Sequence, residues 1–350
     1  MRQFGPGGAR FEHSVMCAGL IATLGGGVAF AEPHRESDTL TNIRQITNNT
    51  VGLEKAGEAY FSADASMVIF QAVPKGEKHY QIYTISLEPG AEPKMVSTGR
   101  GACTCGYFHP DGKKIIFASS HTDPRIDDPT IEIPMPGYKR KGSRYQWDFN
   151  PFMEIYQANL DGSDLKSLTN KPGYDAEGAY SRDGKMIAFA SNRGGDMNIY
   201  TMRADGSNVR QITHAKNSYN GGPFFSPDGK RIVFRADRQK RDYLQLYVVN
   251  ADGTNEVQLT DNEHVNWAPY WHANGKCVLY TTSEQGHRNY EVYLLNVETR
   301  AKHRITNSPR FDGLPVFSND GKKMMWTSQR GSGGSSQVFI ADFTLPAGFD

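Results

Sequence analysis

Side chains that carry oxygen recur at two fixed positions before a short motif that the chain repeats. The motif is an aromatic residue, Ser or His, one variable residue, Asp or Asn, and in five of its six copies Gly. Six residues before the Ser or His, the copies carry Ala56, Cys103, Asp175, Asn220, Asn266 and Asp312. Four residues before it, they carry Glu58, Cys105, Glu177, Gly222, Ala268 and Leu314. Carboxylate and amide oxygens bind hard cations and orient polar or basic ligands.

Two interpretations of these residues remain open. As a site, the carboxylates and amides would surround a bound ligand, and the candidate ligands for calcium or magnesium are Glu58, Asp175, Glu177 and Asp312. As structural residues, Asp and Asn at the start of a strand hydrogen-bond the backbone of their own turn. A pair such as Glu58 and Glu177 could also act as acid and base, although paired carboxylates are more often cation ligands or hydrogen-bonded structure.

The spacing of the motif predicts the elements that must position these residues. Counted at the Ser or His, the steps are 47, 72, 45, 46 and 46 residues. A period in the forties is typical of an array of repeats. Each unit reads as four short antiparallel strands joined by tight turns, and such a sheet needs a neighbour on both faces. The sequence therefore predicts an all-β, six-bladed β-propeller with one four-stranded blade per repeat.

The two ends of the array predict how the ring closes. The last repeat ends at "QVFIADF" and lacks a fourth strand, whereas "IRQIT" at 43–47 nearly repeats "VRQIT" at 209–213. We expect this N-terminal strand to complete the sixth blade, because an unpaired strand edge promotes aggregation. The propeller would then cover residues 40–350.

The first 31 residues differ from the rest. Arg2 and Arg10 precede the uncharged stretch "VMCAGLIATLGGGVAF", which leads into a small-residue pattern at 29–31. This arrangement is typical of a secretory signal peptide, and residues 32–39 would form a short linker. The apolar stretch is 16 residues long, short for a membrane-spanning helix. We expect a periplasmic or secreted mature chain without a transmembrane segment.

Composition narrows the class of partner. The chain has 39 Lys and Arg against 38 Asp and Glu, and without residues 1–31 it has 37 of each. A neutral chain without a basic stripe is not expected to bind nucleic acid. The three cysteines after residue 31, an odd number, favour packing roles over a disulfide framework.

The repeat consensus resembles that of the TolB family. "FSPDGKRIVF", followed by "LYVVNADGTNEVQLT", is similar to the WD-like repeat of TolB propellers, and the likeness extends over essentially all of the expected mature chain. The resemblance implies the propeller portion alone, since TolB also carries an α/β domain ahead of its propeller. Similar repeats precede the catalytic domain of prolyl-oligopeptidase-like peptidases, but no Gly-x-Ser-x-Gly elbow is present here.

The resemblance also implies that the loops entering the innermost strands share one rim of the channel. The 72-residue step places an insert at 121–152 on that rim, opened by His121 and containing an aromatic cluster with Tyr145 and Trp147. Disordered segments are poor in aromatic residues, so we expect an ordered lid or binding wall, or else a loop packed outside the blade.

These patterns predict an exported binding module, a monomer, that holds a protein segment or a polar ligand such as a saccharide at the channel rim. The contacts expected for that ligand are Glu58, Asp175, Glu177, Asn220, Asn266, Asp312, His121, Tyr145 and Trp147. Calcium or magnesium in the ring is the one cofactor that the residues suggest. Two alternatives stay open: a metal-dependent hydrolase or lyase acting on a saccharide-like substrate, and a structural interaction ring.

Overall fold

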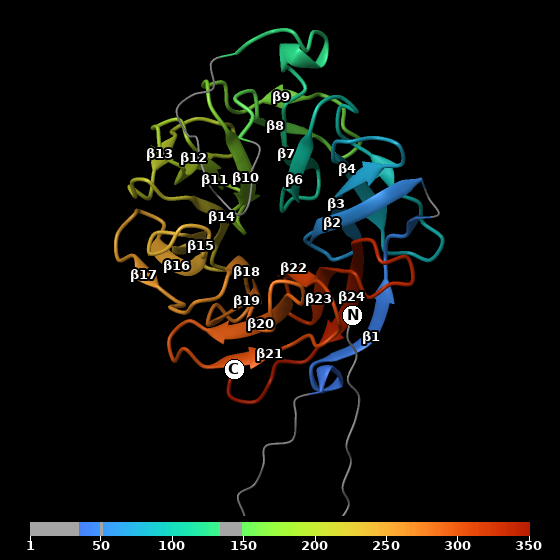
Figure 1. Ribbon diagram of the computed structural model, residues 1–350, viewed down its shortest axis with the longest axis vertical. Coiled ribbons are helices and arrows are strands. Elements are labelled where there is room, and N and C mark those ends of the chain that lie inside the picture. The colour runs from blue at the N-terminus through green and yellow to red at the C-terminus, as the bar shows by residue number, and fades with distance from the viewer. Residues whose placement is uncertain (1–34, 50–51, 134–148) are drawn as a thin grey trace, which may run out of the picture. The chain divides into compact units, whose positions relative to one another are not determined.

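The protein is described by a computed structural model for residues 35–49, 52–133 and 149–350. All described residues belong to one compact unit. In the described part of this unit, 24 strands form six four-stranded antiparallel sheets around a central axis (Figure 1). The predicted all-β, six-bladed propeller is confirmed.

Each blade uses consecutive strands, with the first one innermost (Figure 1). Blade 1 contains β2 Leu53–Phe61, β3 Met67–Pro74, β4 Gln81–Ser86 and β5 Lys94–Met95. Blade 2 contains β6 Cys103–Phe108, β7 Lys114–Ser119, β8 Glu154–Asn159 and β9 Lys166–Ser167. Blade 3 contains β10 Asp175–Tyr180, β11 Met186–Ser191, β12 Asn198–Arg203 and β13 Arg210–Gln211.

The second half of the ring repeats this plan. Blade 4 contains β14 Asn220–Phe225, β15 Arg231–Ala236, β16 Gln245–Asn250 and β17 Val257–Gln258. Blade 5 contains β18 Asn266–Trp271, β19 Cys277–Thr282, β20 Glu291–Asn296 and β21 Lys302–Arg304. Blade 6 contains β22 Asp312–Phe317, β23 Lys323–Ser328, β24 Gln337–Phe343 and, as its fourth strand, β1 Leu40–Gln45. The 3₁₀ helices η1 Glu36–Asp38 and η3 Pro124–Ile126 lie outside the sheets.

The N-terminal strand closes the ring. β1 runs antiparallel to β24, with Leu40 opposite Phe343 and Gln45 opposite Phe339. Just after β1, the hydroxyl of Thr47 accepts a hydrogen bond from the backbone N–H of Val338 at 3.0 Å. Thr213 makes the same contact to β12 in blade 3, where it accepts from the N–H of Ile199 at 2.9 Å. The repeated Ile-Thr ending therefore pins an outer strand to its neighbour, and the expected closure is confirmed.

The repeated motif forms a hydrogen-bonded turn at the end of each innermost strand. In blade 4 the Ser226 hydroxyl donates to Asp228 at 2.6 Å and accepts from the N–H of Arg231 at 2.9 Å. In blade 2, His109 takes the place of the serine, and its ring nitrogen lies 3.1 Å from the carbonyl oxygen of Gly184 in blade 3. These residues shape and connect the blades on the rim opposite the strand entries.

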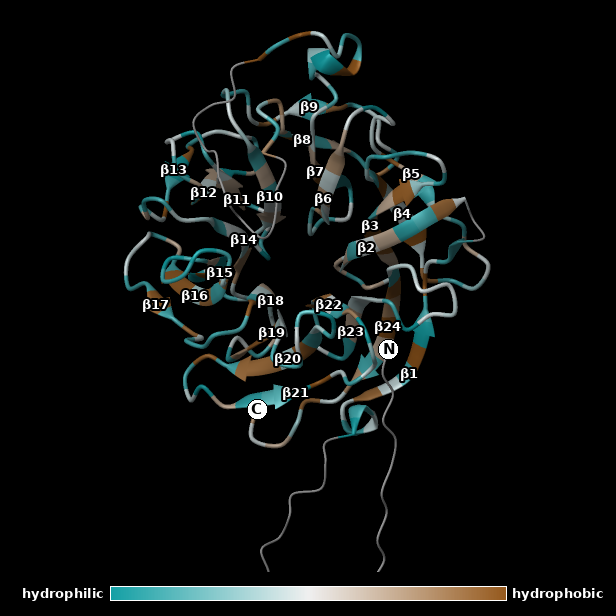
Figure 2. Cartoon of the chain, in the orientation of Figure 1, coloured by the Kyte–Doolittle hydropathy of each residue, from teal (hydrophilic) through white to brown (hydrophobic). Residues whose placement is uncertain are grey.

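Apolar side chains between the blades form the core. The fourth residue of every second strand is a fully buried aromatic ring: Phe70, Phe117, Phe189, Phe234, Tyr280 and Trp326. Burying one such side chain stabilises the fold by roughly 1.5–3 kcal/mol. Figure 2 shows the same division, since apolar colour gathers in strands such as β20 and the connecting loops are mostly polar.

Candidate functional site

Each innermost strand carries a β-bulge at the same place. In β10, Ala176 pairs with Ala190 and Ala179 pairs with Ala188, so Glu177 and its successor lie opposite one residue. The other five innermost strands show the same register shift. At the bulge, the residue four before the motif is left-handed, with φ between +43° at Glu58 and +58° at Glu177. A bulge interrupts the alternation of side chains and redirects the bulged residue.

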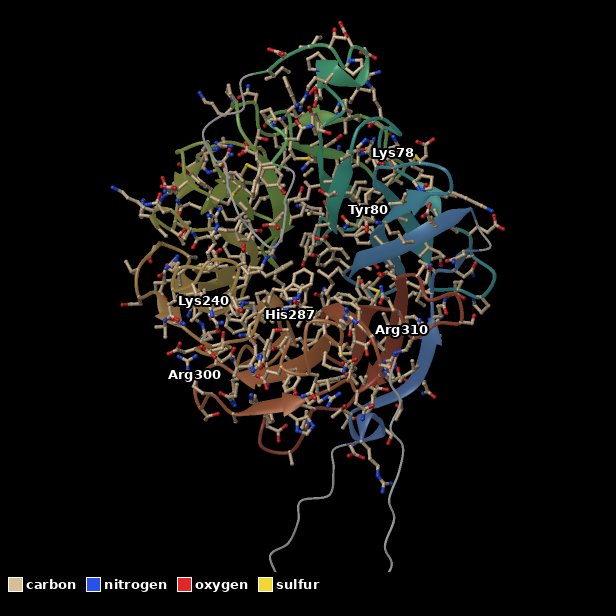
Figure 3. The ribbon with its side chains drawn as sticks, viewed as in Figure 1. Lys78, Tyr80, Lys240, His287, Arg300 and Arg310 are labelled. Carbon is tan, nitrogen blue, oxygen red and sulfur yellow. The ribbon has the colours of Figure 1, made fainter. Side chains whose placement is uncertain are left out.

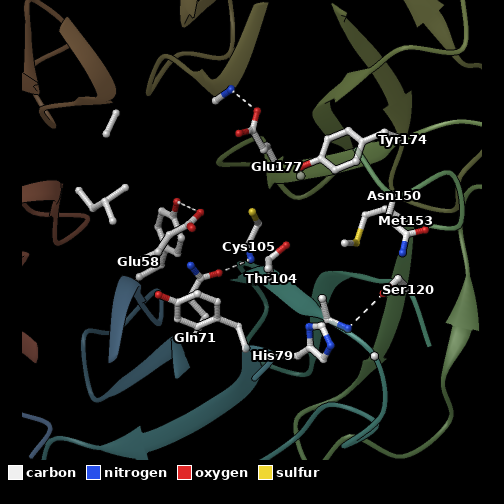
Figure 4. A pocket seen from close by; sticks show the side chains of 18 of the residues that line it. Glu58, Gln71, His79, Thr104, Cys105, Ser120, Asn150, Met153, Tyr174 and Glu177 are labelled. Atoms are coloured by element: carbon white, nitrogen blue, oxygen red, sulfur yellow. Dashed lines mark hydrogen bonds between the residues drawn. The ribbon is translucent and has the colours of Figure 1, made fainter. Parts of the chain in front are cut away.

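These six left-handed residues, which we call the inner ring, surround one cavity of about 1030 Å³. They are Glu58, Cys105, Glu177, Gly222, Ala268 and Leu314, one from each blade. Figure 4 shows Glu58, Cys105 and Glu177 at the edge of this cavity. Blades 1–3 supply its polar members and blades 4–6 supply its small or apolar members, so the two halves of the ring differ in chemistry.

Contacts between blades hold the inner ring in place. The backbone N–H of Glu58 donates to the hydroxyl of Thr327 at 3.0 Å, and that of Leu314 donates to Thr281 at 3.0 Å. The N–H of Cys105 donates to the side-chain oxygen of Gln71 at 3.2 Å. Because each acceptor belongs to the second strand of the preceding blade, closing the propeller fixes the direction of the bulged residue.

The residues six before the motif, which we call the outer ring, lie inside the blades. Asp175 accepts from Arg193 at 2.5 Å, and Asp312 accepts from Arg330 at 2.7 Å. Asn220 accepts from Arg238 through its side-chain oxygen at 2.7 Å. In all three blades the arginine stands 18 residues further along the chain.

The arginine of each pair also covers an aromatic ring of its own blade. Arg193 lies 5.1 Å from the ring centre of Phe189, and Arg330 lies 4.9 Å from that of Trp326. Asn266 follows a different pattern, because its amide donates to Gln245 at 3.0 Å and to Asn262 at 2.9 Å. None of these outer-ring residues lines the cavity. This corrects the expectation of a single ring, since the bulge sends residues two positions apart in different directions.

The four carboxylates considered as metal ligands are thereby divided. Glu58 and Glu177 face the cavity. Asp175 and Asp312 are buried, and each forms an ion pair with an arginine. Within the described ranges, no group of three or more His, Cys, Asp or Glu side chains is placed to hold a metal ion.

Glu177 is held by several donors. It accepts from the hydroxyl of Tyr219 at 2.9 Å and from the N–H of Gly222 at 2.7 Å, and it forms an ion pair with Arg235. The Arg235 guanidinium also lies over the rings of Tyr219 and Trp267, at 5.5 and 6.0 Å from their centres. Sequence reasoning missed Arg235, although an arginine within the apolar strand "RIVFRA" was a usable signal.

Fewer hydrogen-bond donors contact Glu58 than Glu177. Its carboxylate accepts from the hydroxyl of Tyr60 at 3.3 Å and lies beside the Cys105 thiol. Burial raises the pKa of the Glu58 carboxyl, and the charge of Glu177 raises it further. Burial likewise raises the pKa of the Cys105 thiol, which keeps this cysteine protonated.

Aromatic rings close the channel below the inner ring. Tyr60, Tyr107, Phe224 and Tyr270, from four blades, have ring centres 4.9 to 6.2 Å apart. The hydroxyls of Tyr107 and Tyr270 are 3.1 Å apart. Phe224 and Tyr270 border both the large cavity and a smaller one of about 80 Å³. The large cavity is therefore a cup with an aromatic floor.

Loops of blades 1 and 2 form part of the wall of the cup. Lys78 and Tyr80, labelled in Figure 3, come from the β3–β4 loop. From the insert, buried Asp123 binds Arg125 at 2.6 Å and accepts from the amide of Asn150 at 2.8 Å. This contact joins the two described ends of the insert at the wall of the cup.

The remaining predicted contacts lie elsewhere. His121 is hydrogen-bonded to Ser119 at 2.9 Å and packs on Tyr156 with ring centres 4.6 Å apart, and it does not line the cup. Burial lowers the pKa of this histidine. Tyr145 and Trp147 fall outside the described residues. In the part of the chain that the structure covers, no helix is long and apolar enough to cross a membrane.

Comparisons with known sequences agree with the fold. The model of the TolB β-propeller domain matches residues 148–286. An uncharacterised protein of Agrobacterium fabrum is 30% identical over 205 residues, which are 51% of this chain and 69% of that protein. The Tol-Pal system protein TolB of Francisella tularensis is 36% identical over 72 residues, which are 21% of this chain and 16% of that protein.

Solved structures show the same fold at lower identity. A protein of Agrobacterium tumefaciens provisionally assigned as TolB aligns with a TM-score of 0.58 and 19% identity, over 83% of this chain and 91% of its own. TolB of Acinetobacter baumannii gives 0.52 and 18%, over 82% and 63%. An oligogalacturonate lyase of Vibrio parahaemolyticus gives 0.50 and 12%, over 89% and 98%. Together, the repeats, the six closed blades, the domain match and the relative covered over 69% of its length show that this chain belongs to the TolB β-propeller family.

Proposed function

We propose that this chain is an exported binding module that holds a protein segment or a polar ligand in the cup. The observation that carries the proposal is the cup itself, a cavity of about 1030 Å³ with an aromatic floor and residues from all six blades in its wall. Cavities of several hundred cubic ångströms with apolar walls and a few convergent polar groups are typical ligand sites. In this cavity the convergent polar groups are the carboxylates of Glu58 and Glu177.

Two further observations support export and a protein partner. The N-terminal pattern resembles a signal peptide, which favours a periplasmic or secreted location. Relatives named Tol-Pal system protein TolB share the repeat, although the match covers 16% of their length. Fold likeness alone does not transfer function, so we infer binding from the cup.

A metal-dependent hydrolase or lyase is the second hypothesis from the sequence. Oligogalacturonate lyase shares the fold at 12% identity, which says nothing about shared chemistry. No contact among the described residues favours that activity over binding, and we therefore place it behind binding.

The proposal can be tested with peptides selected from a display library against the parent protein. Leu314→Trp would fill part of the cup, because Leu314 lies in the inner ring. Ala63→Trp, on the rim where the Asp-containing turns lie, introduces the same bulk beside the smaller cavity. We expect selected peptides to lose at least about tenfold in affinity for Leu314→Trp, equivalent to about 1.4 kcal/mol, and to bind Ala63→Trp like the parent.

Thermal melting of both variants would show that the propeller remains folded. Peptides that bind Leu314→Trp as tightly as the parent, and lose affinity for Ala63→Trp, would place recognition on the opposite rim and contradict the proposal.

A further inference from the structure

The two glutamates of the inner ring differ in how their charge is balanced. Glu177 pairs with Arg235, whose guanidinium is nearly buried against Tyr219. Glu58 occupies the equivalent bulge in blade 1, and there Tyr60 and Cys105 supply its hydrogen bonds. No lysine or arginine among the described residues forms an ion pair with Glu58.

The other described carboxylate in the wall of the cup is also balanced. Asp123 is bound by Arg125 at 2.6 Å. Arg235 attracts Glu58 from a distance, but the repulsion from Glu177 is the larger effect on Glu58. The inner ring therefore holds two neighbouring carboxylates with one guanidinium beside them. Lys78 also lines the wall of the cup, but it forms no ion pair with Glu58. A buried charge without a partner is costly, and a cation brought to it recovers part of that cost.

We propose that Glu58 anchors one cationic group of the ligand, a primary ammonium or a guanidinium at the end of a flexible chain. The inference rests on the proposed function, because it names the ligand class of the same cup. A lysine or arginine side chain of a protein segment has this chemistry, and so does a free polyamine.

The cavity already contains an internal example of such recognition. The Arg235 guanidinium sits between the Glu177 carboxylate and the faces of Tyr219 and Trp267. Aromatic faces attract cations, and carboxylates give them charge-assisted hydrogen bonds. Glu58 lies beside the aromatic floor through Tyr60, so it offers the same combination to a cation from outside.

The opposite half of the cup suits the stem of such a group. Its walls include Ala268, Pro269, Leu314 and Pro315, from blades 5 and 6. Long cationic side chains lay their methylene groups along apolar surface and direct the charged end to polar groups. The polar and apolar halves of the inner ring thus match the two parts of one side chain. An anionic group would instead meet both Glu58 and Glu177.

Cation binding at Glu58 would be coupled to a proton. The groups that face Glu58 are Glu177 and Arg235, which act through their charges, and Cys105 and Tyr60, which hydrogen-bond it. Burial and the charge of Glu177 raise the pKa of Glu58, which favours the protonated carboxyl before a ligand binds. A cation favours the ionised carboxylate, so binding should release protons and strengthen as pH rises.

The test uses Nα-acetyl-lysine N-methylamide, its norleucine analogue as an uncharged match, and 1,4-diaminobutane as a free amine. Calorimetry in two buffers of different ionisation enthalpy measures affinity and proton release together. We expect the parent to bind a cationic probe at least tenfold more tightly than norleucine and to release protons. Glu58→Gln should lose that preference, whereas Glu54→Gln, at an exposed site on the same strand, should keep it. A preference for either the lysine probe or the diamine supports the inference and identifies the source.

The inference is overturned if neither cationic probe binds the parent in preference to norleucine, or if Glu58→Gln, still folded by thermal melting, binds them like the parent. Its failure is separable from that of the proposed function. Library peptides that are blocked by Leu314→Trp and unaffected by Glu58→Gln would keep the binding module and remove the cation anchor.

Discussion

The inner and outer rings are separated by two positions in every repeat, yet their side chains lie in different environments. In blade 3, Glu177 of the inner ring faces the cup, and Asp175 of the outer ring is buried against Arg193. In blade 6 the contrast is the same, with Leu314 in the cup and Asp312 bound by Arg330. In blades 3, 4 and 6 the outer-ring residue ties the start of the innermost strand to an arginine of its own blade, whereas the inner ring lines the cup.

This difference shows that the role of a carboxylate at the start of a strand can be assigned only when the backbone conformation there is known. A regular strand would place residues i and i+2 on the same face. The bulge, with its left-handed residue, breaks that rule in all six innermost strands. Stability should therefore depend on the outer ring, and recognition should depend on the inner ring.

The largest effect should come from opening the ring that holds both sets of residues. Deleting residues 40–47 removes β1 and exposes the edge of β24. We expect loss of cooperative unfolding or aggregation, because the sixth blade is left with three strands. Chemical unfolding followed by fluorescence, with light scattering for aggregation, would measure this. If the shortened chain melts like the parent, closure by β1 does not contribute to stability.

Asp312→Ala should break an outer-ring contact. It leaves Arg330 buried without this partner, although Glu36 still binds the arginine at 2.8 Å. Removing one member of a buried ion pair costs about 3–5 kcal/mol, and we expect the lower end of that range. Urea unfolding would measure the loss. Asp312→Asn is the matched control and should lose less, because Asn220 already pairs with Arg238 through an amide. An Asp312→Ala variant as stable as the parent but unable to bind ligand would move Asp312 into the site.

Glu291→Gln should change how stability depends on pH. Burial raises the pKa of Glu291 to about 7, and nearby Asp312 of the outer ring contributes to the rise. Since the folded pKa lies above the unfolded value of about 4.5, the associated stability is full below pH 4.5 and is lost as pH rises through 7.

The glutamine variant loses the charge in the 2.7 Å contact with Arg304, but it should remove that slope. Its stability relative to the parent should therefore rise by about 1–2 kcal/mol as pH increases from 5 to 8, after allowance for solvent screening. Glutamine occupies the matching position in blades 1, 4 and 6, at Gln81, Gln245 and Gln337. Melting temperatures across this range would test it, with exposed Glu298→Gln as the control. An unchanged slope in Glu291→Gln would show that Glu291 is not the titrating group.

The smallest effect should come from glycine at matched positions of the two rings. Ala268 of the inner ring has φ of +51°, whereas Ala56 of the outer ring is a buried residue in extended strand β2. Glycine relieves the strain of a left-handed residue. In a regular strand, by contrast, it lowers the free energy of unfolding by about 0.5–1 kcal/mol. Ala56→Gly should therefore destabilise the protein and Ala268→Gly should be neutral or stabilising in urea unfolding. Equal destabilisation by both would weaken the distinction between the rings.

The sequence predicted the fold in considerable detail because the relevant signals are local and repeated. The turn motif, the Ile-Thr strand endings and the incomplete sixth repeat each depend on neighbours within a few residues or on simple counting. They led to six blades and to closure by the N-terminal strand, both of which the structure contains.

The candidate site was predictable only in part. Glu58 and Glu177 were found from their spacing, and both line the cup. Arg235 was missed because it belongs to blade 4 and pairs with a glutamate of blade 3, 58 residues earlier in the chain. The aromatic floor joins four repeats in the same way, and no periodicity within one repeat reports which rings meet at the axis.

By itself, then, the sequence determined the repeat, the number of blades and the strand that closes them, since these follow from local hydrogen bonding and from apolar faces that need covering. Only the tertiary structure decided which carboxylates line the cup and which are buried inside a blade. The bulge geometry depends on acceptors from the preceding blade, such as Thr327 for Glu58 and Gln71 for Cys105, and these contacts exist only once neighbouring blades have packed. The same packing brings Arg235 to Glu177 and gives Glu58 no ion pair with a described arginine or lysine.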